Sequence, residues 1–87
     1  MRLPVEPERL RRRYPSLSDE DLAAFAEVSA RVLAATGARG RVLAGVMSAA
    51  LRGREKEAAG ATLDGEERTA LAYTRALSKM QDGAPDA

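Results

Sequence analysis

Helix-start signals at two places in the chain constrain the fold more than any other feature. In the stretch LSDEDL, Ser18 is a good N-cap because its hydroxyl can accept a backbone N–H of the first turn. The acids Asp19, Glu20 and Asp21 then stand at the positive end of the helix dipole. Apolar side chains follow at the helical period, so this stretch predicts the start of a helix.

The second signal is LDGEE at residues 63–67. Asp64 is placed as an N-cap, and Glu67 has the capping-box spacing behind it. The two stretches LSDEDLAAFA and LDGEERTALA share a pattern at an offset of 46 residues. We interpret the likeness as shared helix-start chemistry in preference to duplication.

Apolar periodicity and glycine positions give the bounds of the expected helices. We predict helices over about 18–36, 39–58 and 64–81, with a short helix over 5–13 that stops ahead of Pro15. Strand-type alternation is absent, and the eighteen alanines and twelve arginines favour helix. The sequence therefore predicts an all-α fold, a small three-helix bundle with a short N-terminal helix or arm.

We expect the 87 residues to form a single helical domain. Within it, residues 1–16 are predicted as a basic arm or short helix, residues 17–81 as the bundle and residues 82–87 as a loose tail. No run of eighteen apolar residues exists, and the first ten residues lack the apolar core of a signal peptide. We therefore expect a cytoplasmic protein with no membrane partner.

The composition excludes several kinds of chemistry. Without cysteine or histidine the chain makes no disulfide, no zinc site of Cys or His and no Cys or His nucleophile. The consecutive acids 19–21 point about 100° apart on a helix, so they do not converge on one metal ion. No glycine-rich phosphate loop or nucleophile elbow is present. We predict no metal, no cofactor and no enzymatic activity.

Charge is nearly balanced overall but arranged in blocks. Residues 1–13 carry five arginines and two glutamates, whereas residues 19–27 carry four acids and no base. A candidate basic patch, for an anion or an acidic partner, consists of Arg9, Arg11, Arg12, Arg13, Arg52, Arg54 and Lys56. Three interpretations stay open for the N-terminal arginines: solvation or local pairing, which we favour, an acidic protein partner, or nucleic acid. Few aromatic side chains are available to stack on nucleic-acid bases, because Tyr14 is the only aromatic residue beside the arginine run.

The segment 39–58 is apolar or small around much of its circumference, which is more surface than two neighbouring helices need. Its predicted partner-binding face comprises Val42, Leu43, Val46, Met47 and Leu51. Exposed apolar stripes often mark interfaces, and a second copy is the commonest partner. The sequence therefore predicts a non-enzymatic helical interaction module that self-associates or acts as a partner-binding adaptor. The alternative is a nucleic-acid-binding protein that uses the arginine-rich N-terminal segment.

Overall fold

Residues 7–82 of the chain are described by a computed structural model. They form the helices α1 (Pro7–Arg13), α2 (Asp19–Ala34), α3 (Arg39–Ala58) and α4 (Gly65–Asp82), with no strand between residues 7 and 82. The predicted all-α class is confirmed. Four helices are present in this part of the chain, so the predicted three-helix bundle with a short N-terminal helix or arm is not confirmed. None of the described helices is long and apolar enough to cross a membrane.

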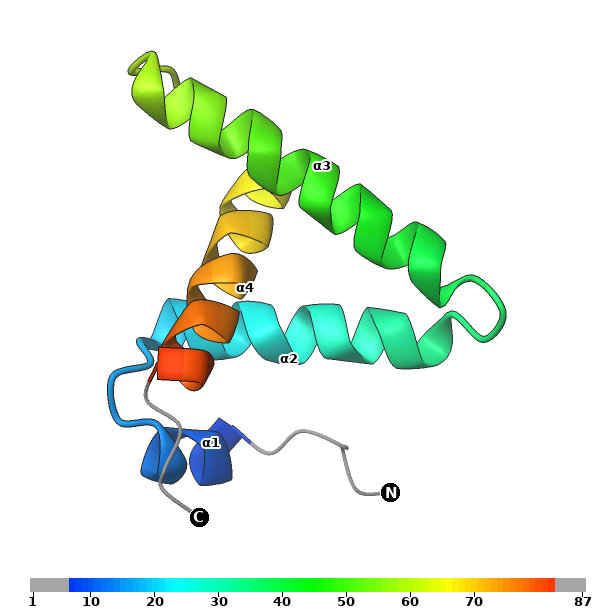
Figure 1. The fold of residues 1–87 in the computed structure, drawn as a ribbon, viewed down its shortest axis with the longest axis vertical. Coiled ribbons are helices and arrows are strands. Elements are labelled where there is room, and N and C mark those ends of the chain that lie inside the picture. The colour runs from blue at the N-terminus through cyan, green and yellow to red at the C-terminus, as the bar shows by residue number, and fades with distance from the viewer. Residues whose placement is uncertain (1–6, 83–87) are drawn as a thin grey trace.

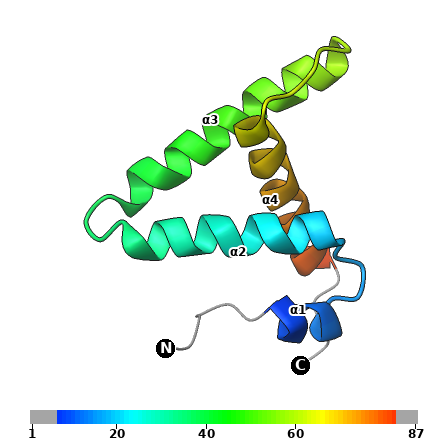
Figure 2. The same ribbon diagram turned by 180° about the vertical axis from the view of Figure 1, so that it is seen from behind.

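The three long helices are arranged as a triangle (Figure 1). Helices α2 and α3 diverge from the turn at residues 35–38, and α4 forms the third side. Figure 2 shows the same triangle from behind, with α1 beside the start of α2. Helix α4 packs closely against both α2 and α3, whereas α2 and α3 contact each other much less. Helix α4 therefore holds the other two long helices together.

The helix bounds follow from local chemistry. Ser18 caps α2 by accepting the backbone N–H of Asp21 at 3.1 Å. The turns that end α2 and α3 contain Gly37 and Gly60, whose φ angles of +86° and +72° are accessible to glycine at little cost. Helix α3 differs from α2, because its N-cap residue Ala38 makes no side-chain hydrogen bond. The predicted start of a short helix at residues 5–6 and the tail at 83–87 lie outside the described residues.

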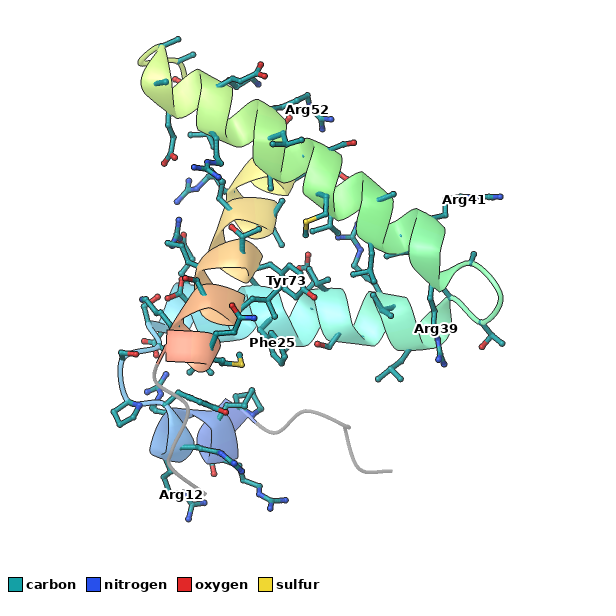
Figure 3. The ribbon with its side chains drawn as sticks, viewed as in Figure 1. Arg12, Phe25, Arg39, Arg41, Arg52 and Tyr73 are labelled. Atoms are coloured by element: carbon teal, nitrogen blue, oxygen red, sulfur yellow. The ribbon has the colours of Figure 1, made fainter. Side chains whose placement is uncertain are left out.

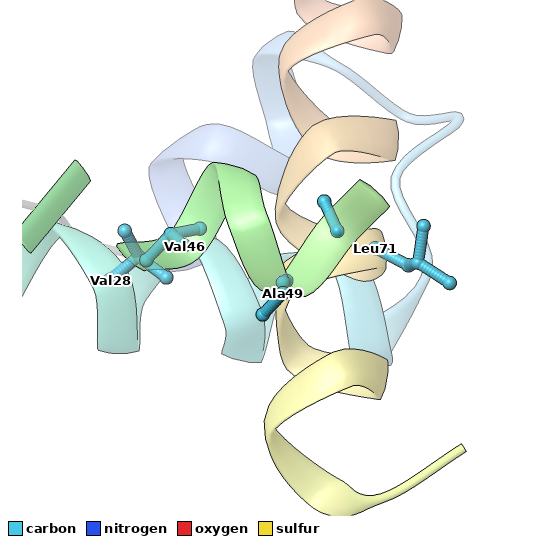
Figure 4. Packing of buried hydrophobic residues seen from close by; sticks show 6 residues of the cluster. Val28, Val46, Ala49 and Leu71 are labelled. Atoms are coloured by element: carbon cyan, nitrogen blue, oxygen red, sulfur yellow. The ribbon is translucent and has the colours of Figure 1, made fainter. Parts of the chain in front are cut away.

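Two apolar clusters form the core. The first joins the three long helices and is built from Val28 of α2, Val46 and Ala49 of α3 and Leu71 of α4, together with smaller neighbours (Figure 4). Many of the buried residues in both clusters are alanines, which let helix backbones approach closely. This packing leaves one face of α3 directed away from the other helices.

The second cluster lies at the start of α2 and includes side chains of α1 and α4. Leu17, Leu22 and Ala76 are buried there, and the half-buried Leu10 and Tyr14 pack against them. Phe25 of α2 and Tyr73 of α4 stack with ring centroids 5.9 Å apart (Figure 3). Helix α1 and the turn after it are thus packed on the fold by apolar contacts.

Candidate interaction surface

The fold divides the predicted partner-binding face of α3. Val46 is buried in the first cluster, Leu43 is half-buried and packs against that cluster, and Val42 is also half-buried. Met47 and Leu51 are 40% and 62% exposed, although both are large and apolar. Val46 therefore belongs to the chain's own core, and Met47 and Leu51 are the part of the predicted face that a partner can reach.

Met47 and Leu51 belong to a longer row on the solvent side of α3, which we name the α3 stripe. All its members are exposed: Gly40, Ala44, Met47, Leu51, Arg54 and Ala58. Their spacing alternates between four and three residues, which is the spacing of a coiled-coil seam. The α3 stripe therefore has the geometry of a helix face that packs against another helix.

A polar row runs along one side of the α3 stripe. It consists of Arg41, Ser48 and Glu55, spaced seven residues apart and all exposed. Arg41 projects outward from α3, away from α2 (Figure 3). Within residues 7–82, neither Arg41 nor Glu55 forms an ion pair. We call Arg41, Ser48 and Glu55 the flanking row.

Glycines on α3 differ in what surrounds them. A Cβ built at Gly53 would lie 2.8 Å from Cδ1 of Leu71, so the chain's own packing requires a glycine there. A Cβ at Gly40, in the α3 stripe, would meet no atom within 4 Å. The fold of a single chain therefore gives no packing reason for glycine at position 40.

The predicted basic patch is not one surface. Arg9, Arg11, Arg12 and Arg13 lie on α1, while Arg52, Arg54 and Lys56 lie on the second half of α3, at the opposite end of the long axis (Figure 1). All seven are exposed except Lys56, which is half-buried. The fold thus separates the two basic segments.

The four arginines of α1, which we name the α1 arginine cluster, are Arg9, Arg11, Arg12 and Arg13. Two of them make contacts within the fold. Arg11 forms an ion pair with Asp19 at the start of α2. The guanidinium of Arg13 lies 6.0 Å from the ring centroid of Tyr14, a distance at which cation–π attraction operates. Arg12 extends away from the fold (Figure 3).

Arg52 and Lys56 bind a buried carboxylate that sequence reasoning treated only as a helix-start residue. Glu67 is 1% exposed, and its Oε1 accepts hydrogen bonds from Lys56 Nζ at 2.8 Å and from the backbone N–H of Asp64 at 2.9 Å. Arg52 Nε lies 3.5 Å from the other carboxylate oxygen. The hydrogen bond from Lys56, with that from Asp64, lowers the pKa of Glu67.

Asp21 has an equivalent arrangement at the start of α2. It is fully buried and accepts from Lys79 Nζ at 2.6 Å and from Arg75 Nε at 3.3 Å. Burial raises the pKa of Asp21, but the hydrogen bonds from Lys79, Ser18 and Arg75 outweigh it, and the pKa is lowered overall. The sequence signal for both sites is an arginine and a lysine four residues apart on another helix, Arg52/Lys56 and Arg75/Lys79.

Two open hollows lie along α4, with volumes of about 310 and 300 Å³. They share Glu20 and Arg68, which form an ion pair 3.6 Å long, and Arg75 in the first hollow pairs with the same Glu20 at 2.7 Å. The charged groups shared between the hollows therefore neutralise one another. In the described part of the chain, no group of acidic residues is arranged to hold a metal ion.

Comparison with known protein families, curated proteins and solved structures gives no match to this chain. We therefore infer its function from the geometry of α3 and α1.

Proposed function

We propose that the chain is a non-enzymatic interaction module that self-associates through the α3 stripe. The observation that carries the proposal is the 62% exposure of Leu51 in the second half of a helix face with coiled-coil spacing. An apolar face on a small domain is a common mark of an interface. The composition adds a cytoplasmic location to the proposal, because the chain has no cysteine.

Leu51 and Met47 supply the driving force. Full burial of a leucine is worth about 1.5–3 kcal/mol, so covering the exposed part of Leu51 contributes roughly 1–2 kcal/mol in each copy. Met47, which is unbranched and flexible, adapts its shape to a partner surface. A contact between single helices is smaller than a standard stable interface, so we expect the association to be weak and to depend on concentration.

Nucleic-acid binding through the α1 arginine cluster is the second candidate. Arg9 and Arg12 support it, because both are exposed and Arg12 points into solvent. Against it, Arg52 and Lys56 are bound to Glu67, and the net charge is only +1. Binding of this kind weakens steeply with salt. A polynucleotide titration at low salt, with Arg12→Ala as the variant, separates the two candidates.

The solution mass tests the proposed function. Light scattering after gel filtration, at concentrations from micromolar to millimolar, should give a mass approaching twice the 9.3 kDa of one chain. Leu51→Glu should return the mass to that of a monomer, because a charge in the contact would lose its hydration. Leu77→Glu is the matched control, since Leu77 is also an exposed leucine but lies on α4.

Circular dichroism of both variants checks that the helices are intact. A wild-type chain that stays monomeric over the whole concentration range would refute self-association. A dimer that is equally weakened by Leu51→Glu and Leu77→Glu would place the contact somewhere other than on the α3 stripe.

A further inference from the structure

We infer that the two α3 helices of the dimer run antiparallel, with Arg41 of each copy paired to Glu55 of the other. This inference rests on the proposed self-association and specifies its geometry. It follows from the flanking row. When a second copy of this row runs in the opposite direction, each positive charge lies opposite a negative charge.

The flanking row reads Arg, Ser, Glu at positions 41, 48 and 55. A two-fold axis at Ser48 reverses the order, so that Arg41 faces the partner's Glu55 and Ser48 faces the partner's Ser48. The dimer then contains two ion pairs from a single repeated contact, as an isologous interface requires. A parallel arrangement in register would instead bring like charges to the same level.

The same antiparallel order, with its axis within one residue of Ser48, gives a compatible order of side chains in the α3 stripe. Met47 then faces the partner's Leu51, Ala44 faces the partner's Arg54, and Gly40 faces the partner's Ala58. Gly40 and Ala58 at the ends let the two backbones approach, Met47 and Leu51 fill the centre, and Arg54 lies over the small Ala44 of the partner. This contact supplies a packing role for Gly40, where a Cβ would meet no atom within 4 Å in the single chain.

The helix dipole of α3 supplies an independent reason for the antiparallel order. Arg41 lies in the first turn of α3, which has no acidic residue and no side-chain cap, and Glu55 lies in the last turn. Each charge therefore stands at the end of its own helix where the dipole disfavours it. In the antiparallel pair, the partner's Glu55 comes to the N-terminal end of α3 and the partner's Arg41 to its C-terminal end. Both unfavourable placements are thereby compensated.

Charge reversal tests the pairing. Arg41→Glu alone places glutamates opposite each other, and Glu55→Arg alone places arginines opposite each other. We expect self-association of each single variant to weaken about tenfold at low salt, because two attractive pairs become repulsive. An equimolar mixture of the two variants should form a heterodimer, since every contact then joins a glutamate to an arginine. Native mass spectrometry resolves the heterodimer, because the two chains differ in mass.

Two further variants complete the design. The double variant R41E/E55R should recover wild-type self-association. Arg39→Glu is the matched control, because it makes the same charge change two residues away but outside the flanking row. We expect Arg39→Glu to leave the dimer unchanged.

The outcomes separate this inference from the proposed function. If the wild-type dimer is broken by Leu51→Glu but the mixed charge variants form no heterodimer, the antiparallel pairing is wrong and self-association through the α3 stripe stands. If Arg39→Glu weakens the dimer as much as Arg41→Glu does, net charge and not a specific pair is responsible, which also overturns the inference. If no dimer forms, both proposals fall.

Discussion

Two interior glycines of α3 lie outside the α3 stripe, and replacing each by alanine should have opposite effects. We expect the free energy of unfolding to rise in one variant and to fall in the other. Gly45 and Gly53 both lie within the helix, where glycine costs about 0.5–1 kcal/mol relative to alanine. A Cβ at Gly45 would meet no atom within 4 Å. We therefore expect Gly45→Ala to raise the free energy of unfolding by about 0.5–1 kcal/mol.

Gly53→Ala has the same gain in helix propensity, but its new methyl group would clash with core side chains. Its Cβ would lie 2.8 Å from Leu71 Cδ1, 3.0 Å from Leu63 Cδ2 and 3.1 Å from Leu71 Cγ. Leu71 is 6% exposed and packed in the first cluster, so it has little room to move. Overpacking costs typically 1–3 kcal/mol, which exceeds the helix gain, and we expect a net loss of about 1 kcal/mol.

Urea unfolding followed by circular dichroism measures both effects. The comparison is best made in the Leu51→Glu background, so that self-association does not contribute to the apparent stability. The two alanine variants should then differ by about 1.5–2 kcal/mol, with wild type between them. If Gly53→Ala is as stable as Gly45→Ala, the close contact between α3 and α4 at Leu71 is wrong.

Two other perturbations address the charged contacts. A carboxylate whose pKa is lowered on folding stabilises the fold above its unfolded pKa and loses that contribution as the pH falls through its folded value. The pKa values of Asp21 and Glu67 are lowered from 3.8 and 4.5, so the stability should be constant above about pH 5 and decrease at lower pH. In Asp21→Asn, thermal unfolding should show a smaller decrease in stability over the same pH range. In contrast, Asp19→Asn should change stability by less than about 0.5 kcal/mol, because its ion pair with Arg11 is exposed to solvent.

Features set by neighbouring residues in the sequence were predictable. The expected helix starts at 18, 39 and 64 lie within a residue of those of α2, α3 and α4. Ser18 forms the predicted cap, because capping depends on a side chain and a backbone N–H three residues apart. The end of α1 at Arg13, ahead of Pro15, has the same local origin.

The assignment of α3 side chains to core or surface was not predictable. Val46 and Met47 are adjacent apolar residues, yet Val46 is buried and Met47 is 40% exposed. Consecutive residues of a helix point about 100° apart, so which of them is buried depends on where α4 crosses α3. That crossing is fixed by contacts such as Gly53 with Leu71, which lie far apart in the sequence.

Prediction also missed the buried carboxylates, for the same reason. The sequence places Asp21 and Glu67 in the first turns of helices, where acids are normally solvated. Their burial requires cations from another helix, and those cations are remote in sequence. The basic residues Arg52 and Lys56 were predicted as part of an open patch, whereas the structure binds them to Glu67.

The likeness of LSDEDLAAFA to LDGEERTALA extends beyond helix capping, because both stretches form the same kind of joint. In each, the acid three residues after the cap, Asp21 or Glu67, binds an arginine and a lysine that lie four residues apart on a neighbouring helix. In each, a small residue directly after that arginine packs near the leucine before the cap: Gly53 near Leu63, and Ala76 in the cluster of Leu17. One joint links α3 to α4, and the other links α4 to α2.

The third corner of the triangle has no such joint. Helix α3 begins at Arg39 without a side-chain cap and without an acid in its first turn, so no carboxylate there can receive cations from α2. Contacts between α2 and α3 are correspondingly few, and α3 is held mainly through α4. Among the three long helices, α3 is therefore the one whose first turn lacks a carboxylate of its own. A carboxylate from another chain would stabilise the positive end of its helix dipole. In the proposed dimer the partner's Glu55 brings a carboxylate to this first turn, where it pairs with Arg41.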